Sequence, residues 1–190
     1  MVQIVLALIL WGVSLVASGR VWLDRWVKKL FWVVVFLYFA LDAMLMWQQY
    51  RLWDTNELSR FLLPSYQGAY FFSYSFYNIF APHIIALAVA LVLVYVTTKL
   101  NQKRNYVLFE KEEPYLAGLS LFLVGYPGWL LFLVLLIAVY LTWQLVVLIR
   151  RRNLNLRLPL YSLWPFLALV TAVVIETWLS NTDLWKLLKI

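Results

Sequence analysis

The sequence predicts an all-α fold: a polytopic bundle of about six transmembrane helices in a single membrane domain covering residues 1–190. Hydrophobic residues make up 65% of the chain and charged residues 13%, whereas an ordinary globular domain carries about 25% charged residues. The apolar runs are long enough to cross a bilayer core, which takes roughly 17–25 residues of helix. These runs do not alternate with polar residues, as the strands of a transmembrane barrel do.

Six apolar segments follow one another, separated by basic, aromatic or tight connections. The expected membrane segments are residues 2–17, 30–47, 79–98, 106–124, 129–149 and 159–179. The first segment has no basic residues before it and no small-residue cleavage pattern, which favours a membrane anchor over a signal peptide. The lipid bilayer is therefore the first partner that the sequence predicts.

The connection between the second and third segments, residues 48–78, has a different composition. Asp54 to Glu57 is similar to a capping box, in which Glu follows an acceptor residue by three positions, so we expect a short amphipathic helix that ends before Pro64. Eight aromatic residues lie between Tyr66 and Phe80 inclusive. Because Tyr and Trp gather at the headgroup level of a bilayer, we expect an aromatic-rich interfacial loop on the membrane surface.

Basic residues in short loops predict the orientation of the chain. Loops 18–29, 99–113 and 150–158 each hold four Lys or Arg residues, twelve of the 16 in the sequence. Six alternating spans place these three loops on one face, and the positive-inside rule makes that face cytoplasmic. Both termini are then expected outside a plasma or inner cell membrane. We therefore interpret the net charge of +7 as a result of basic residues that orient the chain in the membrane, and we expect no nucleic-acid partner.

The residue inventory excludes several kinds of site. With no cysteine and one histidine, the chain has no disulfide, thiolate metal site or multi-histidine metal site of its own. No phosphate-binding glycine loop, Ser/His/Asp spacing or nucleotide motif is present, so no metal and no cofactor is expected. The 11 Trp residues are better explained by interfacial belts than by a stacking platform for a flat ligand.

An acidic cluster stands at the start of the fourth segment, where Glu110, Glu112 and Glu113 are followed by Pro114. Proline is favoured at the first position of a helix, and carboxylates there are stabilised by the helix dipole. Two neighbouring carboxylates repel, so one of them holds its proton more tightly, as an acid/base pair requires. The alternative is that these are solvated charges that balance nearby basic residues at a helix start.

Three ionisable residues lie inside the expected spans: Asp42, His83 and Glu176. Such residues are costly in lipid and usually face a bundle interior or a cavity. On the deduced topology all three fall toward the outer third of their helices, where they could meet in one outward-facing pocket, as a proton relay or a substrate clamp. The alternative is that His83 and Glu176 sit at the interface and extend outward.

From Glu113 onward the chain resembles the C-terminal half of the type IV prepilin peptidases, a family of membrane aspartic peptidases. In that family a Gly-x-Gly-Asp motif opens a helix and a glycine follows twelve residues after the Asp. Here Glu113 takes the place of the Asp, and Gly125 lies twelve residues later. A later family segment is matched by Pro165 to Leu169, which read Pro-Phe-Leu-Ala-Leu.

The resemblance implies a role with pilin-type signal peptides or their assembly apparatus, with or without cleavage. The family glycines are replaced by Lys111 and Glu112, and the second catalytic Asp of the family has no counterpart with its usual proline. If the protein cleaves, Glu113 would act with Asp24 or Glu110 to polarise a water. Two other functions stay open: a small transport or binding protein that uses Asp42, His83 and Glu176, and a structural subunit of a larger membrane complex.

Overall fold

The computed structural model describes residues 2–17, 21–103, 105, 113–151, 161, 163–183 and 185. The regular elements among these residues are all helical, which confirms the predicted all-α class. In chain order the elements are α1 (Val2–Ala17), α2 (Val21–Thr55), η1 (Arg60–Leu62), α3 (Pro64–Gln67), α4 (Tyr70–Ser75), η2 (Phe76–Phe80), α5 (Ala81–Lys103), α6 (Glu113–Val124), α7 (Trp129–Arg151), α8 (Leu163–Val174) and η3 (Ile175–Leu179). The short element η1 is a 3₁₀-helix, and η2 and η3 are π-helices.

Three helical stretches of the described chain are long and apolar enough to cross a membrane: Trp26–Thr55, Tyr70–Lys103 and Trp129–Ile149. The last of these coincides with the segment predicted at 129–149. Two further apolar helices, Glu113–Val124 and Leu163–Leu179, are shorter. At 1.5 Å per residue, the 12 residues of α6 cover about 18 Å of a bilayer core that is roughly 30 Å thick. The structure therefore supports a membrane protein with three candidate spans.

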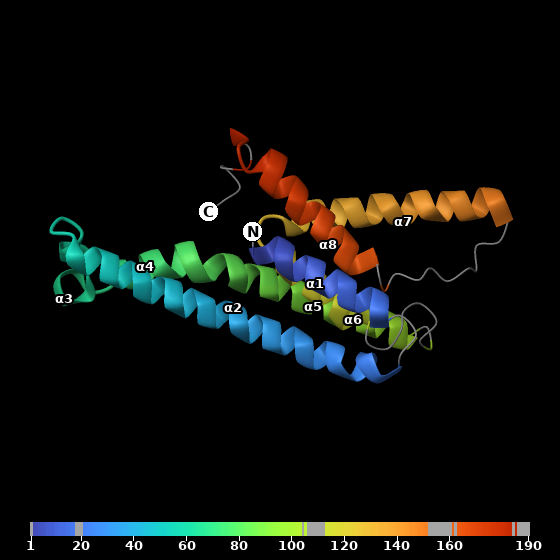
Figure 1. Ribbon diagram of the computed structural model, residues 1–190, viewed down its shortest axis with the longest axis horizontal. Coiled ribbons are helices and arrows are strands. Elements are labelled where there is room, and N and C mark those ends of the chain that lie inside the picture. The colour runs from blue at the N-terminus through green and yellow to red at the C-terminus, as the bar shows by residue number, and fades with distance from the viewer. Residues whose placement is uncertain are drawn as a thin grey trace.

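Helix α6 is the centre of the packing. Every residue of this helix except Tyr115 is buried, and the helix contacts α5 and α8 extensively and α1, α2 and α7 along shorter lengths (Figure 1). A helix that is apolar on all sides is expected to be enclosed by other helices. The approach of α5 is close at Gly118, where a side chain would overlap Val94 and lie 3.3 Å from the carbonyl oxygen of Ala90.

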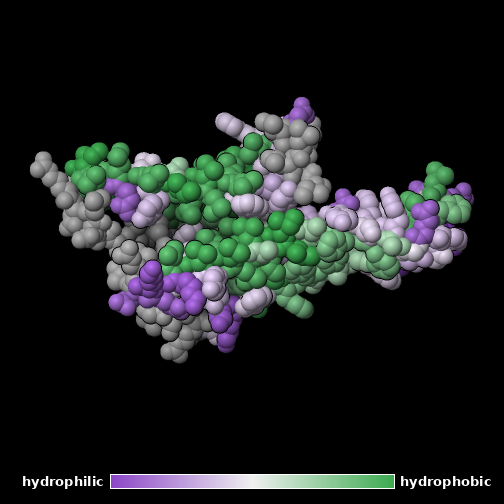
Figure 2. Space-filling view, turned by 180° about the vertical axis from the view of Figure 1, so that it is seen from behind, coloured by the Kyte–Doolittle hydropathy of each residue, from purple (hydrophilic) through white to green (hydrophobic). Residues whose placement is uncertain are grey.

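Helices α2 and α5 run antiparallel, and the two ends of the molecule that they reach differ in chemistry. One end, which we call the basic end, carries Lys28, Lys29, Lys99 and Lys103. The other, the aromatic end, comprises α2 from Trp47 onward, residues 56–69 and α4; it extends beyond the other helices in Figure 1. Figure 2 shows apolar residues over the body of the molecule and hydrophilic residues gathered at the basic end, with a paler, mixed surface toward the aromatic end.

The predicted interfacial loop is wrong from Tyr70 onward, and two predicted boundaries shift with it. Helix α2 continues to Thr55 instead of ending near Trp47, and the stretch from Tyr70 is helical through η2 into α5. The physical reason is mutual packing of aromatic rings. Trp53 lies 5.0 Å from Tyr74, 5.5 Å from Phe71 and 6.3 Å from Tyr70 between ring centroids. Contact with the Trp53 ring on α2 thus holds in a helix residues that would be expected in a surface loop if Tyr and Trp only gathered at the headgroup level.

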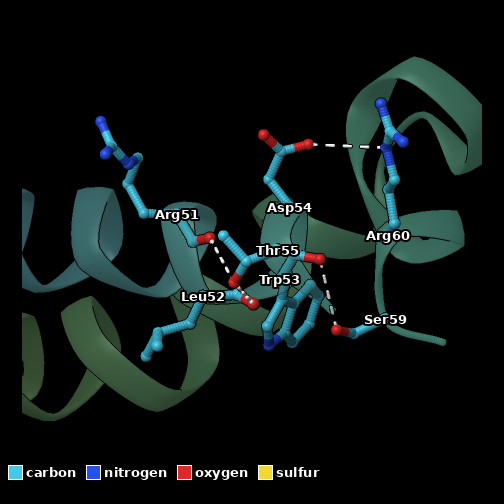
Figure 3. A network of polar contacts seen from close by, with 7 residues as sticks. All are labelled: Arg51, Leu52, Trp53, Asp54, Thr55, Ser59 and Arg60. Carbon is cyan, nitrogen blue, oxygen red and sulfur yellow. Dashed lines mark hydrogen bonds and ion pairs between the residues drawn. The ribbon is translucent and has the colours of Figure 1, made fainter. Parts of the chain in front are cut away.

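The short amphipathic helix predicted after Asp54 is replaced by a turn and a single 3₁₀ turn, η1. Figure 3 shows the end of α2, where the hydroxyl of Thr55 donates to the carbonyl oxygen of Leu52 at 3.0 Å and Asp54 pairs with Arg60 at 3.6 Å. The side-chain oxygen of Asn56 accepts the N–H of Leu58 at 3.0 Å. Such local bonds from side chain to backbone favour a turn over continued helix, and Pro64 begins α3 instead of ending a helix.

Helix α7 is the least enclosed of the long helices. It contacts α6 and α8, and Figure 1 shows its C-terminal part extending past the end of the bundle. Large apolar side chains are exposed along its length, among them Val134, Leu141 and Ile149. Because α7 has no charged residue before Arg150 and exposes apolar residues on several faces, it is suited to a lipid environment.

Candidate functional site

Asp42 on α2 and His83 on α5 form a polar pair inside the apolar helix bundle. The Nδ1 atom of His83 lies 2.9 Å from Oδ2 of Asp42, so a proton on Nδ1 is donated to the carboxylate. The side chain of Asp42 is 2% exposed and that of His83 is 23% exposed. The imidazole is therefore the more exposed member of the pair.

Aromatic rings form one wall of the pair. Tyr38 lies one helical turn before Asp42 on α2, and its ring packs edge-on against His83 at a centroid distance of 5.3 Å. The same ring contacts Phe122 of α6 at 5.3 Å. The Tyr38 hydroxyl is buried and has no hydrogen-bond partner among the described residues. Helices α2, α5 and α6 thus all contribute to the surroundings of the pair.

Local sequence explains the irregular backbone next to His83. Pro82 has no N–H to donate, and a proline inside a helix disturbs the hydrogen bonds of the preceding turn. The π-helix η2, Phe76–Phe80, ends two residues before this proline. The side-chain amide of Asn78 donates to the carbonyl oxygen of Tyr74 at 2.9 Å, which satisfies one backbone acceptor there. Single π turns within helices occur frequently at functional sites.

The pair lies deep along its helices. Asp42 follows Lys29 by thirteen residues on the unbroken helix α2, a rise of about 20 Å at 1.5 Å per residue. His83 precedes Lys99 by sixteen residues on α5, or about 24 Å. If the lysines of the basic end lie at one interface, the pair falls within the far part of a hydrocarbon core roughly 30 Å thick.

Glu113 occupies a different site, at the start of α6. Its side chain is buried, with the residue 3% exposed, and Oε1 accepts a hydrogen bond from Nε1 of Trp164 at 3.1 Å. This burial contradicts the alternative of a solvated helix-start charge for Glu113. Lys28 lies near the same end of α6, with its Nζ 5.5 Å from the centre of the Tyr115 ring.

The remaining predicted site residues are placed separately or lie outside the described part of the chain. Glu110, Glu112 and the side chain of Asp24 lie outside it, so the predicted pairing of Glu113 with another acid stays a prediction. Glu176 lies on η3, where it is exposed, and η3 directly continues α8. Of the three residues expected in one pocket, the structure brings Asp42 and His83 together.

Two residues of these sites were missed by reasoning from the sequence. Tyr38 had an available signal, because residues four apart share one face of a helix and Asp42 was already singled out. For Trp164 the sequence offers no such signal beyond its position next to Pro165, because Trp164 contacts Glu113, which is 51 positions away in the sequence.

The described residues contain no group of three or more His, Cys, Asp or Glu side chains that could hold a metal ion. Comparisons of the chain with family models, with curated proteins and with solved structures each return no match.

Proposed function

We propose that the chain is a small membrane transport or binding protein in which Asp42 and His83 take up and release a proton. The observation that carries this proposal is the 2.9 Å contact between an imidazole and a carboxylate that is 2% exposed. Ionisable residues within membrane segments are rare because they are costly there, and they commonly mark ion pathways and proton relays.

The geometry suits a relay in which the more exposed group meets the proton first. A proton binds Nε2 of His83, and the proton on Nδ1 then passes to Oδ2 of Asp42. The products are a neutral imidazole with its remaining proton on Nε2 and a protonated Asp42. In a transport cycle Asp42 releases this proton to water on the opposite side of the membrane, and the imidazole regains its starting form by losing the proton on Nε2 and binding one at Nδ1. One proton then crosses per cycle, and no other reactant is needed. Histidine is suited to this role because its charge changes near physiological pH.

The test compares Asp42→Asn with Asp54→Asn in the full chain reconstituted into liposomes. Asp54 is a matched control because it lies on the same helix but is exposed at the aromatic end. Proton uptake, followed with a pH-sensitive dye inside the vesicles, should be lost in Asp42→Asn and retained in Asp54→Asn. Uptake by Asp42→Asn at the wild-type rate would rule out the relay.

A second candidate function, a role with pilin-type signal peptides, is favoured by one specific contact. The two segments that resemble the prepilin peptidases meet where the indole of Trp164, next to Pro165, donates to the carboxyl group of Glu113. Under this proposal Glu113→Gln abolishes cleavage of a pilin leader peptide, or weakens its binding if the protein does not cleave. Full activity and unchanged peptide binding in this variant would remove the assignment.

The proposed topology has six membrane segments, a cytoplasmic basic end and both termini outside a plasma or inner membrane. The absence of cysteine from the sequence makes the native chain a ready background for accessibility labelling. Single substitutions Lys29→Cys at the basic end and Ser59→Cys at the aromatic end should react with membrane-impermeant reagents from opposite sides of the membrane. Labelling of both positions from the same side would contradict this arrangement.

A further inference from the structure

We propose that Tyr38 is a third polar member of the Asp42–His83 site, and that its hydroxyl holds the carboxyl group of Asp42 when His83 releases it. This inference rests on the proposed proton uptake by the pair. Tyr38 acts in it as a positioning residue: its hydroxyl takes no part in the transfer from His83, but keeps Asp42 hydrogen-bonded through the cycle.

Tyr38 lies beside both partners of the pair. Tyr38 and Asp42 are four residues apart on α2, so their side chains share one face of the helix. The ring of Tyr38 also packs edge-on against His83. The hydroxyl-bearing side chain therefore neighbours both partners of the pair, from the same helix as the carboxylate.

The hydroxyl of Tyr38 is buried. Tyr38 is 6% exposed, and among the described residues its hydroxyl has no hydrogen-bond partner. A buried polar atom without a partner costs free energy, which a phenylalanine of nearly the same shape would avoid. Phenylalanine fills comparable buried positions nearby, at Phe31 and Phe122. A hydroxyl that binds the carboxyl group of Asp42 after His83 has released it accounts for the tyrosine at this position.

The chemistry of a hydroxyl suits both protonation states of Asp42. A hydroxyl both donates and accepts hydrogen bonds, whereas an ionised carboxylate only accepts and a protonated one also donates. The Tyr38 hydroxyl can therefore donate to Asp42 when it is ionised and accept from Asp42 when it carries the proton. The bond between Asp42 and His83 changes in the same cycle, because the imidazole moves its proton from one nitrogen to the other.

Few other titratable groups face this site. Among the described residues, η2 and α4 carry no charged side chain. The acid of α6, Glu113, lies at the far end of that helix from Phe122. The charges at this site are therefore mainly those of Asp42 and His83 themselves.

The test is Tyr38→Phe in the full chain, with Tyr50→Phe as the matched control on the same helix. Since the sequence contains one histidine, ¹⁵N labelling of histidine yields NMR signals from His83 alone. We expect Tyr38→Phe to slow proton uptake roughly two- to tenfold, the loss of one hydrogen bond. We also expect it to move the ¹⁵N signals of the His83 ring, because the hydrogen bonds made by Asp42 set the surroundings of Nδ1. Tyr50→Phe should match the wild type in both measurements.

The outcomes separate this inference from the proposal on which it rests. If Tyr38→Phe keeps the wild-type uptake rate and histidine NMR signals while Asp42→Asn loses uptake, Tyr38 is a packing residue and the inference is overturned, but the proton relay stands. If Asp42→Asn also behaves as the wild type, the relay fails and the role of Tyr38 fails with it. Because Tyr38→Phe retains the ring that contacts His83 and Phe122, a folded variant is expected, and its NMR spectrum verifies this.

Discussion

A double-mutant cycle on Asp42 and His83 measures how strongly the pair is coupled and what it contributes to stability. The three variants are Asp42→Leu, His83→Leu and the double substitution. At the observed 2.9 Å, a fully charged pair attracts with about 6 kcal/mol at an effective dielectric constant of 20. Desolvation opposes this attraction, because the Asp42 side chain is 2% exposed.

Removal of one partner leaves the other buried without compensation, so each single variant should lose roughly 3–5 kcal/mol of unfolding free energy. The double variant, with leucine at both positions, should be close to wild type or more stable, because replacing a buried pair by apolar residues is often neutral or stabilising. The coupling energy is then several kcal/mol. A neutral hydrogen bond between membrane helices is coupled by about 0.6 kcal/mol on average and by about 1.7 kcal/mol at most.

The assay is reversible unfolding of the purified protein in mixed detergent micelles, with helicity as the readout. Coupling above about 2 kcal/mol identifies an ion pair, and coupling near 0.6 kcal/mol identifies a neutral hydrogen bond. Additive effects of the two single substitutions would refute the contact. A double variant that is stable but takes up no proton shows that the pair serves function, since the fold does not depend on it.

Single substitutions at Gly118, Trp164 and Leu141 test two buried contacts and the exposed surface of α7. Gly118→Leu should lower the melting temperature by roughly 2–12 °C, because its side chain would overlap Val94; an unchanged melting temperature would mean that α5 and α6 do not pack closely. Trp164→Phe should lose about 1–3 kcal/mol, because it removes the indole N–H that Glu113 accepts; equal stability in detergent unfolding would contradict that bond. Leu141→Arg places a charge near the middle of α7, at a position 61% exposed, and should cost roughly 2.5–3.5 kcal/mol in a glycosylation-based insertion assay; unimpaired insertion would show that α7 does not cross the membrane.

The sequence by itself determined the class of the protein and several of its elements. The high share of apolar residues and the length of the apolar runs indicate helices in a membrane, because a bilayer offers backbone polar groups no partner outside the helix. The span predicted at 129–149 coincides with a candidate span of the structure. The helix start at Glu113 and Pro114 is where α6 begins, because proline and an acidic residue are both favoured in a first helical turn.

Tertiary structure decided which residues meet. Asp42 and His83 are 41 residues apart and Glu113 and Trp164 are 51 apart, so each contact depends on the rotation and register of two helices. In a soluble protein an amphipathic pattern shows which face of a helix is buried. A membrane helix is apolar toward lipid and toward its neighbours alike, and this removes that pattern. At the aromatic end, contacts between Trp53 and rings 17 to 21 residues later in the chain hold an expected surface loop in a helix. These contacts too depend on how two helices lie against each other.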